Sequence, residues 1–321
     1  MSTDMKRRLV GASERVYRIV TGAVSVFHRR RLSRLSRDAG EIWSVIRQDT
    51  LATIGVGIIF VFGFLAIFGP FIVPYDPGAT QRAADGGVLR MTEPTFQHWL
   101  GTTNYGEDVL SQVVVSTRVS VLVGLLAALI AVFIGANVAL ISAYYGGLVD
   151  DALMRVVDVA YGLPFLPFVI VLVFIFGTNI WNVIIVIAAI LWRDSARVVR
   201  SEVLTQKERP YVKSARAVGA SDFRIMYIHI LPNVIPLVGL YMAFAVAYAI
   251  IYEASLAFLG FSDPRLFSWG QMIFQAYQSG GIRFAYWWVI PPGVCLMLLV
   301  MAVFFIGRSL EQLTNPELRH R

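Results

Sequence analysis

Three long stretches without a charged side chain constrain the fold of this chain more than any other feature of its sequence. Residues 51–73, 119–149 and 159–192 span 23, 31 and 34 positions and contain no Asp, Glu, Lys or Arg. About 20 apolar residues are enough for a helix to cross the hydrocarbon core of a bilayer. Only 15% of the 321 residues are charged, against about a quarter in soluble domains. The sequence therefore predicts an all-α integral membrane protein.

Charged residues and turn signals divide the chain into six predicted membrane helices. The longest uncharged stretch is too long for one helix, and a Gly-Thr-Asn sequence at 177–179 marks a turn inside it. The fourth helix has only 13 residues from Ile180 before Arg193 interrupts it. We therefore expect it to be buried among other helices and to continue through Arg200. The predicted spans are 51–73, one helix within 119–149, 156–176, one helix from residue 180, 230–252 and 284–307.

The distribution of lysine and arginine predicts the orientation of these helices. If both termini are cytoplasmic, 23 of the 28 Lys and Arg residues fall in cytoplasmic segments and only 4 in outer loops. Cytoplasmic loops of membrane proteins carry an excess of these residues. We expect a multi-pass protein of the cell membrane with both termini in the cytoplasm.

Residues 1–41 form a basic N-terminal extension that precedes a predicted transmembrane domain over 42–318. Arg18 interrupts the only apolar stretch of the extension and no small-residue cleavage site follows it, so we do not expect a cleaved signal peptide. Residues 16–27 can form an amphipathic helix on the inner membrane surface, or the extension can be a basic tail that sets orientation. We expect membrane lipid, not nucleic acid, as the partner of this charge.

A polar, basic segment at 209–233 separates two very apolar regions. Pro210 suits the first turn of a helix over 211–218, and Gly219 suits a left-handed helix end. Ser221 can cap a second helix with an apolar stripe at i, i+3, i+4 and i+7. The stripe consists of Phe223, Met226, Tyr227 and Ile230. Two interpretations remain open: a surface helix on the protein or the bilayer, or a docking helix that inserts into another subunit.

The same segment resembles the EAA loop in the membrane subunits of ABC importers. The residues that carry this resemblance are Ala215, Gly219, Ala220, Ser221, Leu231 and Pro232. Lys213 stands where that loop usually has a glutamate. Residues 100–111 and the pairs Trp269-Gly270 and Pro292-Gly293 resemble, more closely, the second permease of the peptide and nickel import group. The resemblance covers roughly residues 42–318.

This resemblance implies a type I ABC importer permease with six transmembrane helices and a coupling loop over 211–231. The residues that it implies for ATPase coupling are Ala215, Gly219, Ala220, Ser221, Asp222, Phe223, Arg224, Ile225, Met226, Leu231 and Pro232. The implied partners are a homologous second permease, two ATPase subunits that bind the ATP, and an extracellular solute-binding protein. The implied solute is a peptide, a nickel chelate or an oligosaccharide.

The sequence contains no motif for catalysis or for a bound cofactor. It lacks the phosphate-binding pattern G-x-x-x-x-G-K-[ST], and its four histidines have no metal-site spacing. We therefore expect no enzymatic activity, no cofactor in this chain and no metal. An ion-coupled secondary transporter is the alternative function, and it would need ionisable residues inside the membrane. A membrane-embedded enzyme is a third class, which would need a clustered catalytic set.

Four polar or amphipathic residues in or near the predicted spans are candidates for a solute path. They are Asn137, Tyr161, Asn179 and Asn182. Each can line such a path or can hydrogen-bond a neighbouring helix instead.

Three charged residues follow the second predicted span. Asp151, Arg155 and Asp158 are spaced i, i+4 and i+7, which predicts a ladder of ion pairs along one helix face. An intramembrane relay is the alternative interpretation.

Overall fold

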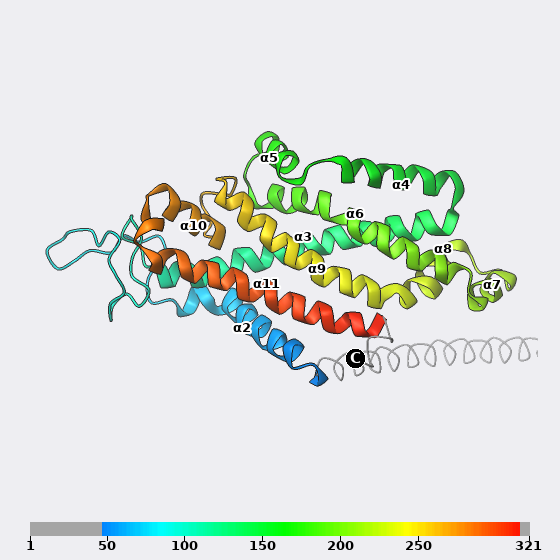
Figure 1. Cartoon of the computed structure of the whole chain (residues 1–321), viewed down its shortest axis with the longest axis horizontal. Helices are drawn as coiled ribbons and strands as arrows, with labels where there is room; N and C mark the ends of the chain where they lie inside the picture. The colour runs from blue at the N-terminus through cyan, green and yellow to red at the C-terminus, as the bar shows by residue number, and fades with distance from the viewer. Residues whose placement is uncertain (1–46, 315–321) are drawn as a thin grey trace, which may run out of the picture. The chain divides into compact units, whose positions relative to one another are not determined.

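The computed structural model describes residues 47–314, and the regular structure within this range is helical (Figure 1). No β-strand occurs in this range. Two isolated β-bridges lie in the segment that connects the first two long helices. The chain divides into two units, Met1–Asp49 and Thr50–Arg321. The predicted basic extension 1–41 lies outside the described residues.

All the described helices belong to the second unit. They are α2 (Thr50–Ile72), α3 (Val109–Tyr145), α4 (Gly147–Gly162), α5 (Phe165–Phe176), α6 (Ile180–Lys207), α7 (Pro210–Ala217), α8 (Asp222–Arg224), the π-helix η1 (Ile225–Ile230), α9 (Leu231–Phe258), α10 (Trp269–Gln278), the 3-10 helix η2 (Gly281–Arg283) and α11 (Tyr286–Thr314).

Four helical segments in the described range are long and apolar enough to cross a bilayer. They are α2, α3, the continuous segment Asp222–Phe258 and α11. Helices α4 and α5 meet this condition only as a pair, and the pair is bent by 94°. Helix α6 packs along α3 and carries charged residues from Arg193 onward. The all-helical fold is confirmed, whereas the count of six spans stays a prediction.

The second helix begins ten residues before the uncharged stretch 119–149 that predicted it. Helix α3 starts at Val109 because the Asp108 carboxylate accepts hydrogen bonds from the Ser111 backbone N at 2.8 Å and hydroxyl at 2.7 Å. A side-chain acceptor at this position satisfies a backbone N–H that has no partner within the helix. Arg118 therefore lies inside the helix and does not mark its boundary.

The third predicted helix, 156–176, is not one helix. Helix α4 already begins at Gly147 and ends at Gly162, and α5 begins at Phe165. The residue before a proline is driven towards extended backbone, and Leu163 before Pro164 has φ −82° and ψ 124°. The missing proline N–H also removes a helical hydrogen bond, so the two helices meet at a sharp bend.

The fifth predicted helix, 230–252, begins too late. The two short elements α8 and η1 run directly into α9, so one continuous helical segment extends from Asp222 to Phe258. Pro232 cannot donate a backbone hydrogen bond, and the wider π-turn just before it includes a bond from the Leu231 N–H to the Met226 carbonyl. The predicted second short helix is therefore the first part of the fifth span.

Small side chains on α3 allow a close approach to α6. Ala127, Ala131, Gly135, Ala139 and Ala143 recur every four residues and are all buried. A Cβ atom at Gly135 would lie 2.4 Å from the Trp192 carbonyl oxygen on α6. Residues spaced by four share one helix face, and small residues on such a face let two membrane helices pack backbone to backbone. This pair is the most extensive helix contact among the described elements.

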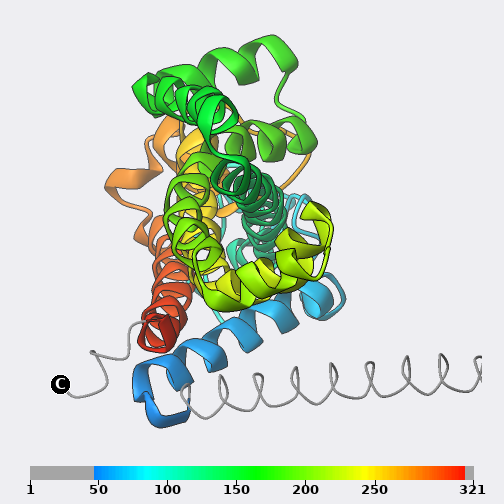
Figure 2. The same ribbon diagram turned by 90° about the vertical axis from the view of Figure 1, so that its right-hand side faces the viewer.

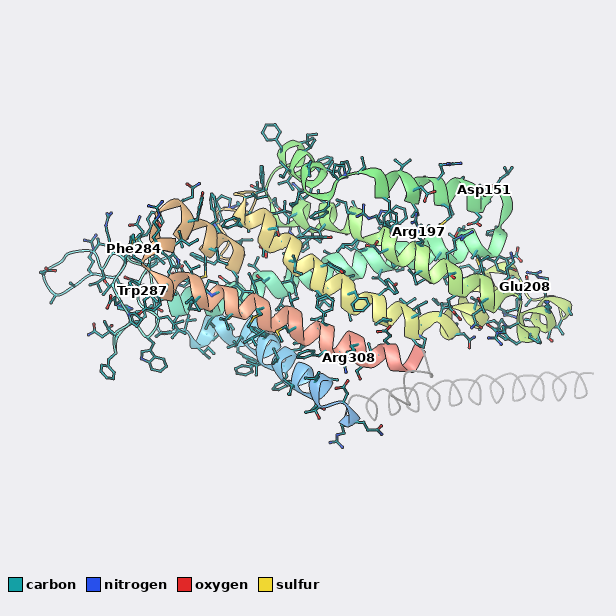
Figure 3. The ribbon with its side chains drawn as sticks, in the orientation of Figure 1. Asp151, Arg197, Glu208, Phe284, Trp287 and Arg308 are labelled. Atoms are coloured by element: carbon teal, nitrogen blue, oxygen red, sulfur yellow. The ribbon has the colours of Figure 1, made fainter. Side chains whose placement is uncertain are left out.

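The two ends of the helical unit differ in chemistry. Phe284 and Trp287 lie at one end, whereas Asp151 and Glu208 lie at the other (Figure 3). Helix α10 belongs to the first end and α7 to the second, and we call them the α10 end and the α7 end. Helices α4 and α5 lie on one side of the unit and α2 on the opposite side (Figures 1 and 2).

Candidate functional site

The segment predicted as a coupling loop folds as its residues indicate. Pro210 occupies the first turn of α7, and Gly219 has a positive φ of 81°. The Ala220 N–H bonds to the Ala215 carbonyl at 3.1 Å, and the Gly219 N–H bonds to the Arg216 carbonyl at 3.0 Å. This pair of hydrogen bonds is a Schellman helix end, in which glycine tolerates the left-handed position best.

The second helical element of the loop is capped as predicted. The Ser221 hydroxyl accepts a hydrogen bond from the Arg224 N–H at 3.4 Å, and Asp222 lies in the first turn. An acidic side chain there interacts favourably with the partial positive charge of a helix N-terminus. The loop therefore turns through an ordered corner between α7 and α8.

The loop has a buried face and an exposed face. Val212, Ala215, Ile225, Met226 and Ile230 are buried, and they belong to one apolar cluster with residues of α3 and α6. In contrast, Val218 is 85% exposed and Phe223 is 67% exposed. The predicted stripe is thus divided, because Met226 and Ile230 face the protein while Phe223 faces away. Of the other coupling candidates, Arg224 and Pro232 are exposed and Ala220 and Leu231 are half-buried.

Tyr144, near the end of helix α3, contacts the corner of the loop. The Tyr144 hydroxyl donates to the Asp222 carboxylate at 2.5 Å. The Arg216 guanidinium lies 5.7 Å from the centre of the Tyr144 ring, and Lys207 lies 6.0 Å from it. Lys213, which replaces the usual glutamate, pairs with Glu208 at 3.2 Å on the surface. Tyr144 therefore contacts the loop through two of its residues, Asp222 and Arg216.

The three candidate asparagines each make hydrogen bonds within the chain. Asn137 accepts a bond from the Tyr227 hydroxyl at 2.6 Å. Asn179 caps α6 through the Trp181 N–H at 2.9 Å, and the Asn182 side chain donates to the Phe176 carbonyl at 2.5 Å. Tyr161, the fourth candidate, lines a cleft between helices.

The predicted ion-pair ladder along residues 151–158 does not form among the described residues. Asp158 pairs instead with Arg197 of α6 at 2.5 Å. Asp150, one residue before the predicted ladder, accepts a hydrogen bond from Arg200 Nε at 2.6 Å. Helix α4 lies beside α6, so arginines on a neighbouring helix reach these carboxylates. Of the three predicted residues, only Asp158 forms an ion pair among the described residues, and its partner lies on another helix.

The cleft that Tyr161 lines has a volume of about 500 Å³ and lies between α3, α4, α6 and α9. Its other polar lining residues are Asp194, Ser195, Tyr241, Tyr248 and Tyr252. None of these five residues was among the candidates predicted from the sequence. Tyr241, Tyr248 and Tyr252 share a face because they are spaced i, i+7 and i+11, and this spacing is the signal that could have found them.

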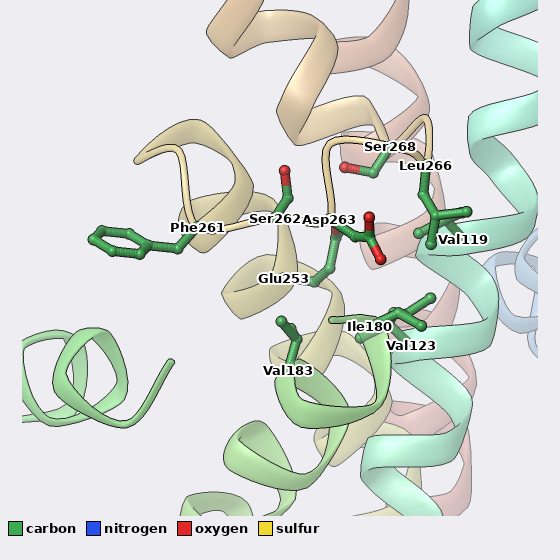
Figure 4. A pocket seen from close by; sticks show the side chains of 10 residues that line it. All are labelled: Val119, Val123, Ile180, Val183, Glu253, Phe261, Ser262, Asp263, Leu266 and Ser268. Carbon is green, nitrogen blue, oxygen red and sulfur yellow. The ribbon is translucent and has the colours of Figure 1, made fainter. Parts of the chain in front are cut away.

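A second, much smaller pocket lies beside Ser268, the N-cap residue of α10 (Figure 4). It has room for about 20 Å³ and is lined by Glu253, Asp263 and Ser268 among others. This volume is enough for about one water molecule. Glu253 is 4% exposed, and its carboxylate accepts a hydrogen bond from the Ser120 hydroxyl at 3.5 Å. The pocket is too small for a solute. Its lining includes residues of α9 and of the loop at 259–268.

Metal ligands do not gather anywhere in residues 47–314. No group of three or more His, Cys, Asp or Glu side chains there is arranged to hold an ion. Cys295 is half-buried and lies in α11. The two features that stand out among the described residues are the exposed apolar side chains of Val218 and Phe223 at the α7 end and the polar cleft between helices.

Two protein-family models match the sequence. The model described as "binding-protein-dependent transport system inner membrane component" matches residues 121–316. The model described as "N-terminal TM domain of oligopeptide transport permease C" matches residues 39–91. Together they cover both the first long helix and the helices that form the loop and the cleft.

Several curated proteins are similar over most of their length. The dipeptide transport system permease protein DppC of Haemophilus influenzae is 32% identical, over 87% of this chain and 95% of that protein. A putative peptide permease of Brucella suis is 33% identical, over 84% and 88%. The glutathione transport system permease protein GsiD of Pectobacterium atrosepticum is 30% identical, over 87% and 91%.

A solved structure shares the fold at low sequence identity. It is described as an inward-facing conformation of the MetNI methionine ABC transporter. The matched chain has a TM-score of 0.51 and 19% identity, and the match covers 62% of this chain and 95% of that one. The fold of about three-fifths of this chain is therefore shared with a chain of a solved transporter.

Proposed function

This chain belongs to the family of binding-protein-dependent transport system inner membrane components, and we propose that it imports peptides as one permease of an ATP-driven transporter. Its relatives carry names of dipeptide, peptide and glutathione permeases, which supports a short peptide as solute. Membership of this family favours ATP-driven import over ion-coupled secondary transport. The partners in this proposal are a second permease, two ATPase subunits and an extracellular solute-binding protein.

One observation carries the proposed coupling role. The loop at the α7 end is anchored by a buried apolar face, yet it leaves two large apolar side chains, Val218 and Phe223, mostly exposed. Exposed apolar groups at the tip of an ordered, basic loop fit a surface that a partner covers. In this proposal they insert into the ATPase subunit, while Ile225 and Met226 hold the loop on the permease.

The connections of the loop supply a route for transmitting movement. Residues Asp222–Phe258 form one continuous helical segment, so a displacement at its first turn moves a helix that lines the cleft. The bond from Tyr144 to Asp222 links the same turn to α3. In this mechanism, ATP binding draws the two ATPase subunits together, and each docked loop moves α3 and α9 of its own permease. The cleft then alternates in access between the two sides of the membrane.

Two substitutions in the loop test the coupling role. Gly219→Val places a β-branched residue at φ 81°, where the only expected effect is backbone strain of about 1–3 kcal/mol because no atom lies within 4 Å of the new Cβ. Phe223→Asp places a charge on the exposed face. Both variants should reach the membrane in normal amounts but lose ATPase subunits on purification and lose peptide uptake.

Matched controls separate docking from general damage. Gly86→Val introduces the same strain at φ 86°, with nothing within 4 Å, in the loop between α2 and α3. Phe96→Asp replaces a fully exposed aromatic residue of that same loop. Both controls should retain the ATPase subunits. Normal uptake by both Gly219→Val and Phe223→Asp would refute the coupling role.

The proposed orientation places the α7 end in the cytoplasm. In sealed cells, a cysteine at Gly86 should react with an impermeant thiol reagent added outside, because this loop lies in the proposed outer region. A cysteine at Ser214, which is exposed on α7, should stay unmodified. Labelling at Ser214 but not at Gly86 would reverse the orientation.

A further inference from the structure

The cleft is lined by one carboxylate, that of Asp194 on helix α6. Asp194 lies 14 residues after the start of α6, which places it about 21 Å along a helix with a rise of 1.5 Å per residue, just after Arg193. Ionisable residues among apolar membrane helices face the bundle interior or a water-filled cavity. Asp194 lines the cleft of about 500 Å³, which is within the usual size range of ligand sites.

We propose that Asp194 binds the protonated amino group of the transported solute as it passes through this cleft. The proposal rests on the proposed function, because it assigns a contact to the solute that the permease moves. Its ligand chemistry is a primary ammonium group, such as the free amino terminus of a short peptide. In this proposal, Asp194 selects for solutes that have a free amino terminus.

The Asp194 carboxylate accepts one side-chain hydrogen bond and forms no ion pair among the described residues. The Tyr161 hydroxyl donates to its Oδ1 atom at 2.5 Å, and no other hydrogen-bond or ion-pair partner of Asp194 occurs among the described residues. An ionised carboxylate has about four acceptor positions. One donor therefore leaves room for the three N–H groups of an ammonium ion.

Two arginines lie beside the Tyr161 ring, and their partners among the described residues are groups other than Asp194. Arg193 Nε has no hydrogen-bond partner in that part of the chain. Arg193 Nη1 donates to the Ala160 carbonyl at 2.6 Å, and Arg197 pairs with Asp158 at 2.5 Å. Both guanidinium groups lie against the Tyr161 ring, 4.7 and 4.2 Å from its centre. They thus hold Tyr161 in place, and Tyr161 in turn holds Asp194.

The opposite wall of the cleft suits the same ligand. Tyr241, Tyr248 and Tyr252 lie on one face of α9. Tyr241 and Tyr252 are 11 positions apart, which corresponds to a rise of about 17 Å along the helix. Their hydroxyl groups form no hydrogen bond with another described residue, so they can bond to peptide groups. Their rings can also attract a cation through its electrostatic interaction with the ring face. The wall therefore offers successive weak contacts along the path.

A cysteine beside Asp194 can report the charge preference of the cleft without knowledge of the natural solute. Val198 lines the cleft one helical turn after Asp194. In a Cys295→Ser background, Val198→Cys is treated with a trimethylammonium thiosulfonate or with its sulfonate counterpart. The complex is purified with its partner subunits. We expect the cationic reagent to react roughly tenfold faster after correction for reactivity with a free thiol, and Asp194→Asn to abolish this preference.

Asp151→Asn is the matched control. It removes a carboxylate from α4, the helix that carries Tyr161, but Asp151 is exposed, does not line the cleft and forms no ion pair with Arg193 or Arg197 among the described residues. This variant should retain most of the preference for the cationic reagent. An equal loss in Asp151→Asn and Asp194→Asn would overturn the assignment of the site to Asp194.

Protection by peptides identifies the ligand group. Dialanine should slow the labelling of Val198→Cys, and N-acetyl-dialanine, which has no ammonium group, should slow it much less. Equal protection by both peptides, or by neither, would overturn the proposal. Retention of the ATPase subunits is measured on the same samples. A complex that keeps these subunits but shows no charge preference contradicts this inference alone, whereas loss of the subunits from the unmodified chain contradicts the proposed function.

Discussion

Gly135 provides the sharpest test of how the helices pack. A Cβ atom at this position would lie 2.0 Å from Ser195 Oγ, 2.4 Å from the Trp192 carbonyl oxygen and 3.0 Å from the Ala196 nitrogen. The Ser195 hydroxyl can rotate away, but the two backbone atoms belong to α6 and can move only with that helix. Gly135→Ala should therefore force α3 and α6 apart.

The expected change in stability combines two opposing effects. Overpacking of a close contact costs about 1–3 kcal/mol. Replacing glycine by alanine within a helix otherwise stabilises it by roughly 0.5–1 kcal/mol. We expect a net destabilisation of about 1–2 kcal/mol, which for a chain of this size corresponds to a few degrees in the melting temperature. Ser195→Ala in the same chain should recover only part of this loss, because the Trp192 carbonyl remains.

The assay is thermal unfolding of the purified protein in detergent, with Gly57→Ala as the control. Gly57 also lies within a helix, but no atom lies within 4 Å of an added Cβ. The control should therefore keep or raise the melting temperature. If Gly135→Ala is as stable as Gly57→Ala, the close packing of α3 against α6 is wrong.

Three further predictions concern the loops and the nucleotide. Tyr144→Phe removes a hydrogen bond to Asp222 worth about 0.5–1.5 kcal/mol and should speed tryptic cleavage after Arg216; unchanged cleavage would mean that this bond does not hold the loop. The Arg265 guanidinium lowers the pKa of Asp263, so the stabilising effect of this ion pair is present above the ordinary Asp pKa and is lost as pH falls through the lowered value. Arg265→Gln should therefore shift the acid-induced increase in hydrogen exchange of residues 259–268 to higher pH, and an unchanged midpoint would contradict this. The chain purified without partners should hydrolyse no ATP, because its sequence lacks a phosphate-binding loop, and turnover without any partner would contradict the assignment.

The conformation of the segment 209–233 was largely predictable because its signals are local. Pro210, Gly219 and Ser221 each restrict the backbone at their own position, and each adopts the predicted conformation. The division of the apolar stripe was not predictable. Whether Met226 or Phe223 faces inward depends on where α3 and α6 lie. The apolar cluster that contains Met226 includes Val203 of α6, 23 positions earlier, and Tyr144 of α3, 82 positions earlier.

The cleft depended on tertiary structure for a similar reason. Asp194 and Tyr161 are 33 residues apart, and the tyrosines of α9 lie further along the chain. Periodicity indicates a buried face in a soluble helix, where polar residues mark the surface. In a membrane helix the lipid and the protein interior are both apolar, so an apolar pattern does not indicate which side packs.

The sequence alone determined that this chain is helical and embedded in a membrane, because long uncharged stretches can satisfy their backbone hydrogen bonds in lipid only as helices or closed barrels. It also determined the family through the residues of the loop. The tertiary structure decided the bend at Pro164, the continuity of the helix from Asp222 and the partners of Asp150 and Asp158. It also brought Tyr161 and Asp194 to one cleft. These features depend on contacts between helices distant in sequence, and no local pattern contains the positions of both partners.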